Sequence, residues 1–223
     1  ISMSIAPNRG VYVPVGHVDV VGNRIEPQLT LEQVRKVLGP VLINPNVRKV
    51  GHNLKFDWKV LRQHGLDLDR AGFDTLIASF ILNPDRRNHG LKDLAADLLG
   101  IRMTRIDELI GSGRKVIPFS QVDLDKASRY SCADADVTLQ LYFLLDQRLD
   151  EAALPSVSAA PSQSEDFFGE TGMPGAPEDA PKSGTSAMRR LFEEIELPLI
   201  PVLMDMDMTG VCIDPQVFAE LSA

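Results

Sequence analysis

Strand-like and helix-like segments alternate over the first 153 residues of this 223-residue chain. Apolar and polar side chains alternate in residues 1–17, with a break at residues 7–10, and this pattern is typical of a β-hairpin. Residues 47–53 predict a second short strand, which is followed by a helical pattern. A strand followed by a helix is the signature of an α/β fold.

Helical periodicity occupies much of the remaining sequence up to residue 153. Thr30 and Gln33 form a capping-box pattern before an apolar stripe, and Gly39-Pro40 predicts the end of that helix. Gly65 and Gly100 each follow a helical pattern at the position where a C-terminal glycine is favoured. Further helices are predicted over residues 56–64, 76–82, 91–99 and about 123–153. The last either runs unbroken through Tyr130 or breaks before it.

The composition is that of an ordinary globular protein, with 44% hydrophobic and 24% charged residues. No window approaches the roughly 18 consecutive apolar residues of a membrane-spanning helix, and the start of the chain lacks a signal-peptide pattern. We therefore expect a cytoplasmic protein with no membrane partner. Cys132 and Cys212 lack metal-site spacing and are interpreted as small apolar residues.

The net charge of -8 argues against a protein that coats nucleic acid by bulk electrostatics. It does not exclude an enzyme that holds a short strand beside metal ions. Local cations such as those at Lys55, Lys59 and Arg62 could meet phosphates, although a solvated surface is the simpler interpretation.

The character of the sequence changes at residue 154. Pro, Ser, Gly, Ala and acidic residues dominate up to residue 187, and this segment is predicted to be a flexible insertion because it has little apolar surface to bury. A new amphipathic helix is predicted from about Arg190, with kinks at Pro198 and Pro201. A turn and a short strand are predicted after it, from Thr209 to Asp214.

Tyr130 and Asp134 carry the most specific chemical signal. Their spacing places a phenol and a carboxylate on one helical face, where they could position and deprotonate a water beside a divalent cation. Asp134 has no obvious basic neighbour in the sequence, so it is costly to bury unless it is paired or metal-bound. Asp57 follows a strand at the first turn of a helix, where it could ligate a metal or simply stabilise the helix dipole.

These segments resemble a known family. Asn53-Leu54-Lys55-Phe56-Asp57 and Tyr130-Ser-Cys-Ala-Asp134-Ala-Asp136 are similar to the second and third exonuclease motifs in the proofreading domains of bacterial family A DNA polymerases. The resemblance covers most of the chain outside residues 154–189. Ile195 to Asp214 resembles the first helix of the polymerase domain.

The resemblance implies a 3'-5' exonuclease with a ribonuclease H-like fold, in which a mixed sheet is flanked by helices. Asp134 and Asp57 would ligate two Mg²⁺ or Mn²⁺ ions, while Tyr130 would orient the nucleophilic water. The substrate would be the single-stranded 3' end of DNA. His52, Asn53 and Phe119 would contact it, with Phe119 stacking on a frayed base.

One family motif does not occur. The first motif, Asp-x-Glu on a strand before the hairpin, supplies two more carboxylates, and the 223 residues contain no Asp-x-Glu. We therefore expect a fragment that lacks the first strand of the fold, and the sheet edges flanking that strand are predicted to be unpaired, which would reduce stability. The fragment itself is predicted to be inactive, with the missing carboxylates lying upstream in the parent protein.

The resulting domain prediction is an incomplete exonuclease domain at 1–153, an insertion at 154–189, and the start of a polymerase domain at 190–223, attached to the rest of the polymerase polypeptide. Two alternatives remain open. One is a non-catalytic exonuclease-fold scaffold of a family A polymerase. The other is a ribonuclease D-like 3'-5' exoribonuclease, against which the polymerase-like segment weighs.

Overall fold

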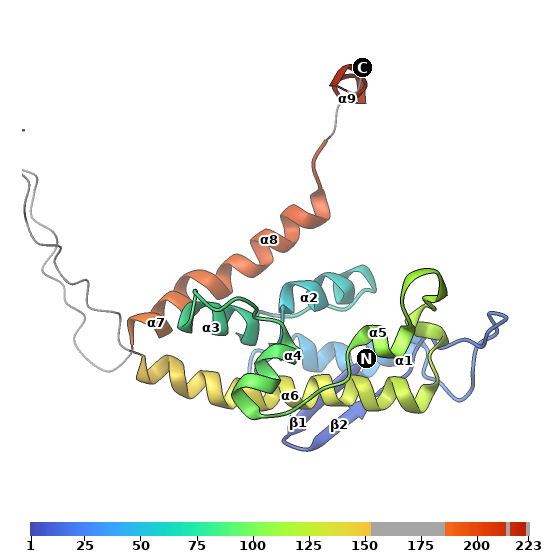
Figure 1. Ribbon diagram of the computed structural model, residues 1–223, viewed down its shortest axis with the longest axis horizontal. Helices are drawn as coiled ribbons and strands as arrows, with labels where there is room; N and C mark the ends of the chain where they lie inside the picture. Colours follow the sequence, from blue (N-terminus) through green and yellow to red (C-terminus); the bar gives the residue numbers. More distant parts are fainter. Residues whose placement is uncertain (153–185, 213–214, 222–223) are drawn as a thin grey trace, which may run out of the picture.

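The computed structural model describes residues 1–152, 186–212 and 215–221 and shows an α/β arrangement. Its largest element is helix α6 (Leu124–Glu151), which runs along the lower side of the molecule in Figure 1. Strands β1 (Ser2–Ala6) and β2 (Arg9–Tyr12) lie against this helix. The predicted hairpin is confirmed, and α6 runs through Tyr130 without a break.

The hairpin is fixed to α6 by a close approach at Gly10. Ser2 pairs with Tyr12 and Met3 with Val11 in antiparallel register. A Cβ atom on Gly10 would lie 2.5 Å from Cβ of Cys132, so only glycine fits against the helix here.

A second, parallel pair of strands lies on the same helix. Strand β3 (Val50–Gly51) pairs with β4 (Phe73–Asp74), so the strand predicted over residues 47–53 is only two residues long. β4 was not predicted, since two residues carry no periodicity. Within the described residues the two pairs form separate sheets and share no strand.

Helix α1 (Leu31–Leu42) begins as its capping box predicts, but its predicted end is wrong. The Thr30 hydroxyl accepts from the Gln33 backbone N–H, and the Gln33 side chain accepts from the Thr30 N–H. The helix then continues past Pro40 to Leu42. A proline ring normally clashes with the Cβ of the preceding residue, and Gly39 has none, so the helical conformation is tolerated.

The other helices follow the predicted order with shifted boundaries. Two of the predicted helices contain π-helical turns. One π-helical turn forms the second half of the helix predicted at 91–99, and the other lies in the helix predicted from about Arg190. A short helix at 106–110 was not predicted. The elements are α2 (Leu54–Gln63), α3 (Thr75–Leu82), α4 (Leu91–Leu94), η1 (Ala95–Leu99), α5 (Ile106–Ile110), η2 (Gly113–Lys115) and η3 (Phe119–Gln121).

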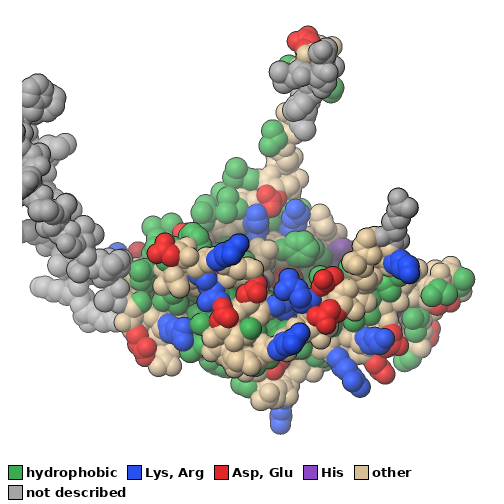
Figure 2. Space-filling view, in the orientation of Figure 1, with side chains coloured by type: hydrophobic (Ala, Val, Ile, Leu, Met, Phe, Trp, Pro, Cys, Tyr) green, Lys and Arg blue, Asp and Glu red, His purple; other side chains and the backbone are tan. Residues whose placement is uncertain are grey.

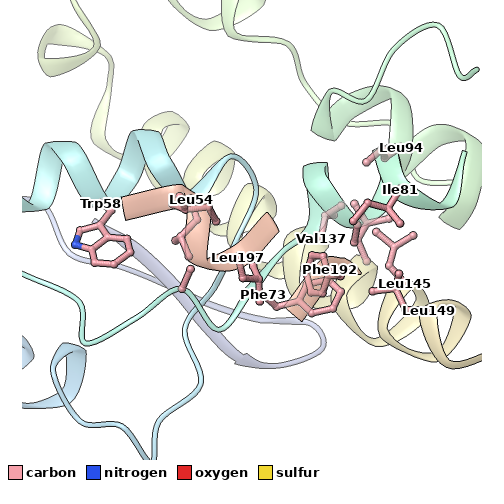
Figure 3. Packing of buried hydrophobic residues seen from close by; sticks show 14 of the residues in the cluster. Leu54, Trp58, Phe73, Ile81, Leu94, Val137, Leu145, Leu149, Phe192 and Leu197 are labelled. Carbon is pink, nitrogen blue, oxygen red and sulfur yellow. The ribbon is translucent and has the colours of Figure 1, made fainter. Parts of the chain in front are cut away.

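After the undescribed stretch, the chain returns as α7 (Ala187–Arg190), the π-helical η4 (Leu191–Glu196) and α8 (Leu197–Thr209). Phe192 is fully buried, and the centres of its ring and the Phe73 ring are 4.7 Å apart. Figure 3 shows the two side chains packed together. Leu197, Ile200 and Met204 belong to the same apolar cluster. The segment assigned to a second domain therefore shares its core with the first 152 residues.

The end of the chain differs from the prediction. No strand forms at Val211 or Cys212, and Ile213 and Asp214 lie outside the described residues. Helix α9 (Pro215–Leu221) follows and was not predicted. The predicted insertion at 154–187 falls almost entirely outside the described residues, so its flexibility stays a prediction.

The surface carries both charge signs. Figure 2 shows Lys and Arg side chains among Asp and Glu side chains on one face, with apolar side chains gathered near α8. Exposed apolar residues of this segment include Ile195, Val202 and Met206. No helix in the described part of the chain has the length and apolarity needed to cross a membrane.

Candidate active site

Tyr130 and Asp134 lie on one face of α6, as their spacing predicts, and each side chain influences the pKa of the other. Burial and then the Asp134 charge raise the pKa of Tyr130 to about 12. The phenol is therefore protonated at neutral pH. A protonated phenol can donate a hydrogen bond to a carboxylate such as Asp134, while its oxygen lone pairs remain able to accept a hydrogen bond from a water.

Asp134 has a basic partner that sequence reasoning missed. The Lys92 ammonium on α4 contacts Asp134 Oδ1 and lies 4.3 Å from the centre of the Tyr130 ring. Burial raises the pKa of Asp134, and Lys92 opposes that rise. The expectation that Asp134 lacks a basic neighbour is therefore wrong, because the neighbour comes from a segment 42 residues away.

Asp57 lies in the first turn of α2, where the residue as a whole is exposed but its carboxyl group is partly shielded from water by its neighbours. Loss of hydration, followed by the nearby Asp74 carboxylate, raises its pKa to about 6. A bound cation would favour the ionised form and offset this shift.

Asp74 is a second residue that the sequence did not single out. Its buried carboxylate accepts from the backbone N–H groups of Asn53 (3.1 Å) and Leu54 (2.6 Å), and also from Leu76 (2.9 Å) and Ile77 (3.3 Å). With these four backbone donors, Asp74 caps the N-terminus of α3 and also fixes the start of α2. The available signal was an aspartate directly before an apolar helical run.

Asn53 and His52 lie between β3 and α2. Asn53 has a left-handed backbone (φ 61°), which asparagine tolerates better than most residues, and its side chain makes no capping bond. His52 Nδ1 lies 2.9 Å from the Thr75 hydroxyl, which donates to the Gly51 carbonyl. That hydroxyl therefore accepts from His52 Nδ1–H, and Nε2 is left as an acceptor.

Burial, followed by the positive charges of Lys92 and His89, lowers the pKa of His52 to about 4. The imidazole is neutral at physiological pH. His52 can thus offer a hydrogen-bond acceptor, but not a positive charge, to a ligand near Lys92.

Phe119 lies beside Tyr130, with 6.2 Å between ring centres. The centre of its ring is also 6.1 Å from that of His17, which in turn contacts Tyr12. These aromatic rings, apart from Tyr130, line a hollow of about 560 Å³. A larger hollow of about 880 Å³ lies between residues 45–49, α2 and α8 and contains none of the predicted site residues.

The basic cluster on α2 is occupied by acidic partners. Lys55 Nζ lies 2.9 Å from Asp207 of α8, and Arg62 donates to Asp205 at 2.6 Å. Asp136 likewise points away from Asp134, since it accepts from the backbone N–H of Asn8 at the hairpin turn at 2.6 Å. These groups hold elements together and are not free for a substrate in this conformation.

The predicted metal ligands are only partly assembled. Asp57 and Asp134 supply carboxylate oxygens, the donors that Mg²⁺ and Mn²⁺ prefer. Within the described residues no group of three or more His, Cys, Asp or Glu side chains gathers. Carboxylate oxygens are suitable ligands for a divalent ion. Two carboxylates are too few to complete a site, so further ligands would be needed.

Comparison with known proteins connects this geometry to a family. The protein-family model that describes the 3'-5' exonuclease domain matches residues 3–150 of this chain. DNA polymerase I of Chloroflexus aurantiacus is 34% identical over 99% of this chain, and that of Rhizobium leguminosarum is 30% identical over 96%. The chain spans about a fifth of the length of these curated relatives, 19% and 18%.

A solved structure also matches. It is described as the POL domain of Pol1 from M. smegmatis in complex with DNA primer-template and dNTP, and it aligns with a TM-score of 0.55 over 86% of this chain and 24% of its own, at 19% identity. At that identity the likeness shows a shared fold. The match to residues 3–150 covers most of the sequence, and the chain therefore belongs to the 3'-5' exonuclease family of DNA polymerase I.

Proposed function

We propose that this chain is the proofreading module of a DNA polymerase I and removes mismatched nucleotides from single-stranded 3' ends of DNA. The observation that carries the proposal is the Tyr130–Asp134 pair on one face of α6, flanked by Phe119. The family match and the polymerase relatives support the reaction class. On this proposal the two strand pairs belong to a ribonuclease H-like sheet.

Each residue has a distinct task in the proposed reaction. Tyr130 keeps its proton, so it orients the attacking water and does not act as the base. Asp134 and Asp57 would hold Mg²⁺ or Mn²⁺, which supplies Lewis acidity for phosphodiester hydrolysis when bound. Asn53 and His52 would contact the terminal nucleotide through hydrogen bonds, and Phe119 through stacking.

We propose that the 223 residues alone do not hydrolyse DNA, because they contain no Asp-x-Glu to complete the ligand set. The full-length polymerase is therefore the protein to test. Asp134→Ala should reduce trimming of a 3'-mismatched DNA primer by at least about a hundredfold, as loss of a metal ligand removes transition-state stabilisation. Primer extension should be largely unchanged.

Asp136→Asn is the matched control. It lies two residues along the same helix and keeps an acceptor for the Asn8 N–H, so trimming should persist. Undiminished trimming by Asp134→Ala would instead support a non-catalytic scaffold. A preference for an RNA strand over the same DNA strand would support the ribonuclease D-like alternative.

A further inference from the structure

Lys92 occupies a defined place beside the candidate active site. Its ammonium contacts Asp134 Oδ1 and lies 4.3 Å from the centre of the Tyr130 ring, and its side chain is only 19% exposed. Among the described residues Asp134 is its one ion-pair partner. Ammonium, carboxylate and phenol therefore form one cluster between α4 and α6.

The packing of α4 holds Lys92 in this position. Leu94 and Ala95 directly after it are fully buried, and the Leu94 N–H donates to Gly90 at 3.0 Å. The preceding loop is anchored by His89, whose Nδ1 lies 2.9 Å from the Ser79 hydroxyl. The backbone of Lys92 is therefore held in place by a buried turn, which positions its side chain beside Asp134.

An ammonium and a divalent ion compete for such a carboxylate. A Mg²⁺ or Mn²⁺ ion needs its oxygen ligand at about 2.0–2.2 Å, and two cations on the same carboxylate repel each other strongly at that range. The long, flexible lysine stem allows the ammonium to withdraw. The ammonium already lies over the Tyr130 ring, and this cation–π contact does not depend on the ion pair with Asp134.

We propose that Lys92 is a built-in counter-ion that pairs with Asp134 in the metal-free protein and is displaced when a divalent ion binds. This inference rests on the proposed function, because it takes Asp134 as a metal ligand. Lys92 satisfies a half-buried carboxylate while the site is empty of metal, and it weakens the affinity of that site for the ion. It is a positioning residue and not a catalytic one.

The test measures Mn²⁺ affinity of the full-length polymerase by the electron paramagnetic resonance signal of free Mn²⁺. Lys92→Met removes the competing charge at similar length, so binding at the exonuclease site should become roughly three- to fivefold tighter. Lys92→Arg keeps the charge and should stay near the wild-type affinity. Where Lys92→Met folds poorly, Lys92→Gln serves, since it still donates a hydrogen bond without a charge.

Two controls isolate the site. Repeating Lys92→Met in an Asp134→Ala background subtracts Mn²⁺ bound elsewhere in the polymerase, and the gain in affinity should vanish there. Arg86→Met removes a nearby cation that pairs with Asp97 and should leave affinity unchanged.

Affinity that is unchanged or weaker in Lys92→Met would overturn the inference. This failure is distinguishable from failure of the proposed function. If Asp134→Ala abolishes trimming while Lys92→Met leaves Mn²⁺ affinity unaltered, only the counter-ion role is lost. If Asp134→Ala leaves trimming intact, the metal-ligand role of Asp134 is lost and the inference falls with it.

Discussion

Asp57 has no ion-pair partner among the described residues, and the like charge of Asp74 acts on its carboxyl group. Its pKa of about 6 in the folded chain lies above the ordinary value of 3.8. A carboxyl group whose folded pKa is raised contributes stability below pH 3.8, and that contribution is lost as pH rises through about 6. The ionised carboxylate therefore lowers the stability of the metal-free protein at neutral pH.

Asp57→Asn should accordingly raise the melting temperature of the metal-free chain at pH 7.5. A two-unit shift corresponds to at most about 3 kcal/mol, and solvent exposure of this side chain reduces the expected gain to about 1 kcal/mol. The gain should shrink as the pH falls from 6 towards 4, which differential scanning calorimetry can follow. A constant gain across this range would contradict the assignment.

Asp19→Asn provides a control of opposite sign. Hydrogen bonds from the Asn23 backbone and side chain lower the pKa of Asp19, so this substitution should reduce stability at pH 7.5. A stabilising effect of both substitutions would indicate a general effect of net charge on this acidic chain.

At the level of elements, the hairpin and α6 are coupled through Gly10. Gly10→Ala would place a methyl group 2.5 Å from Cβ and 2.8 Å from the carbonyl oxygen of Cys132. Relief of this clash would require a shift of the α6 backbone, which costs free energy. We expect a loss of about 2 kcal/mol, seen as a lower urea midpoint. The hairpin can therefore lie this close to α6 only because Gly10 has no Cβ atom.

Gly16→Ala is the matched control. A Cβ at Gly16 would meet nothing within 4 Å, so its stability should change by less than about 0.5 kcal/mol. Equal losses from both substitutions would contradict the role of the Cys132 contact, since the lower entropy of the unfolded alanine chain favours folding at both positions.

At the level of the whole molecule, α7 is joined to α6 by a buried arginine. Arg189 is 5% exposed; it lies 2.6 Å from Asp146 and 2.9 Å from Asp150. Phe192 then enters the core against Phe73. The segment that resembles a polymerase helix is thus anchored on the exonuclease fold by both charge and apolar contact.

Arg189→Met should destabilise the chain by about 2 kcal/mol, because it removes a buried guanidinium that pairs with Asp146 and Asp150 and also donates to the Asp146 carbonyl. Arg190→Met removes only the exposed pair with Glu194 and should cost less than about 0.5 kcal/mol. Chemical denaturation of both variants checks the difference. Similar small losses would show that the apolar contact of Phe192 alone holds α7.

Much of the local structure was predictable, since it depends on neighbours in the sequence. The Thr30 capping box and the helix ends at Gly65 and Gly100 follow from hydrogen bonds and backbone angles within a few residues. Features without a local pattern were missed, such as the two-residue strand at Phe73 and the helix that continues through Pro40.

The sequence by itself determined the family, the helical pairing of Tyr130 with Asp134 and the separate face of Asp136, because a helical repeat fixes which side chains share a face. Only the tertiary structure decided the partners of those side chains. Lys92 reaches Asp134 from 42 residues away, and Asp74 ties two helix starts together. Such contacts depend on how the helices and strands pack against one another. Neither the periodicity nor the composition of the sequence shows which residues distant in the chain will come into contact.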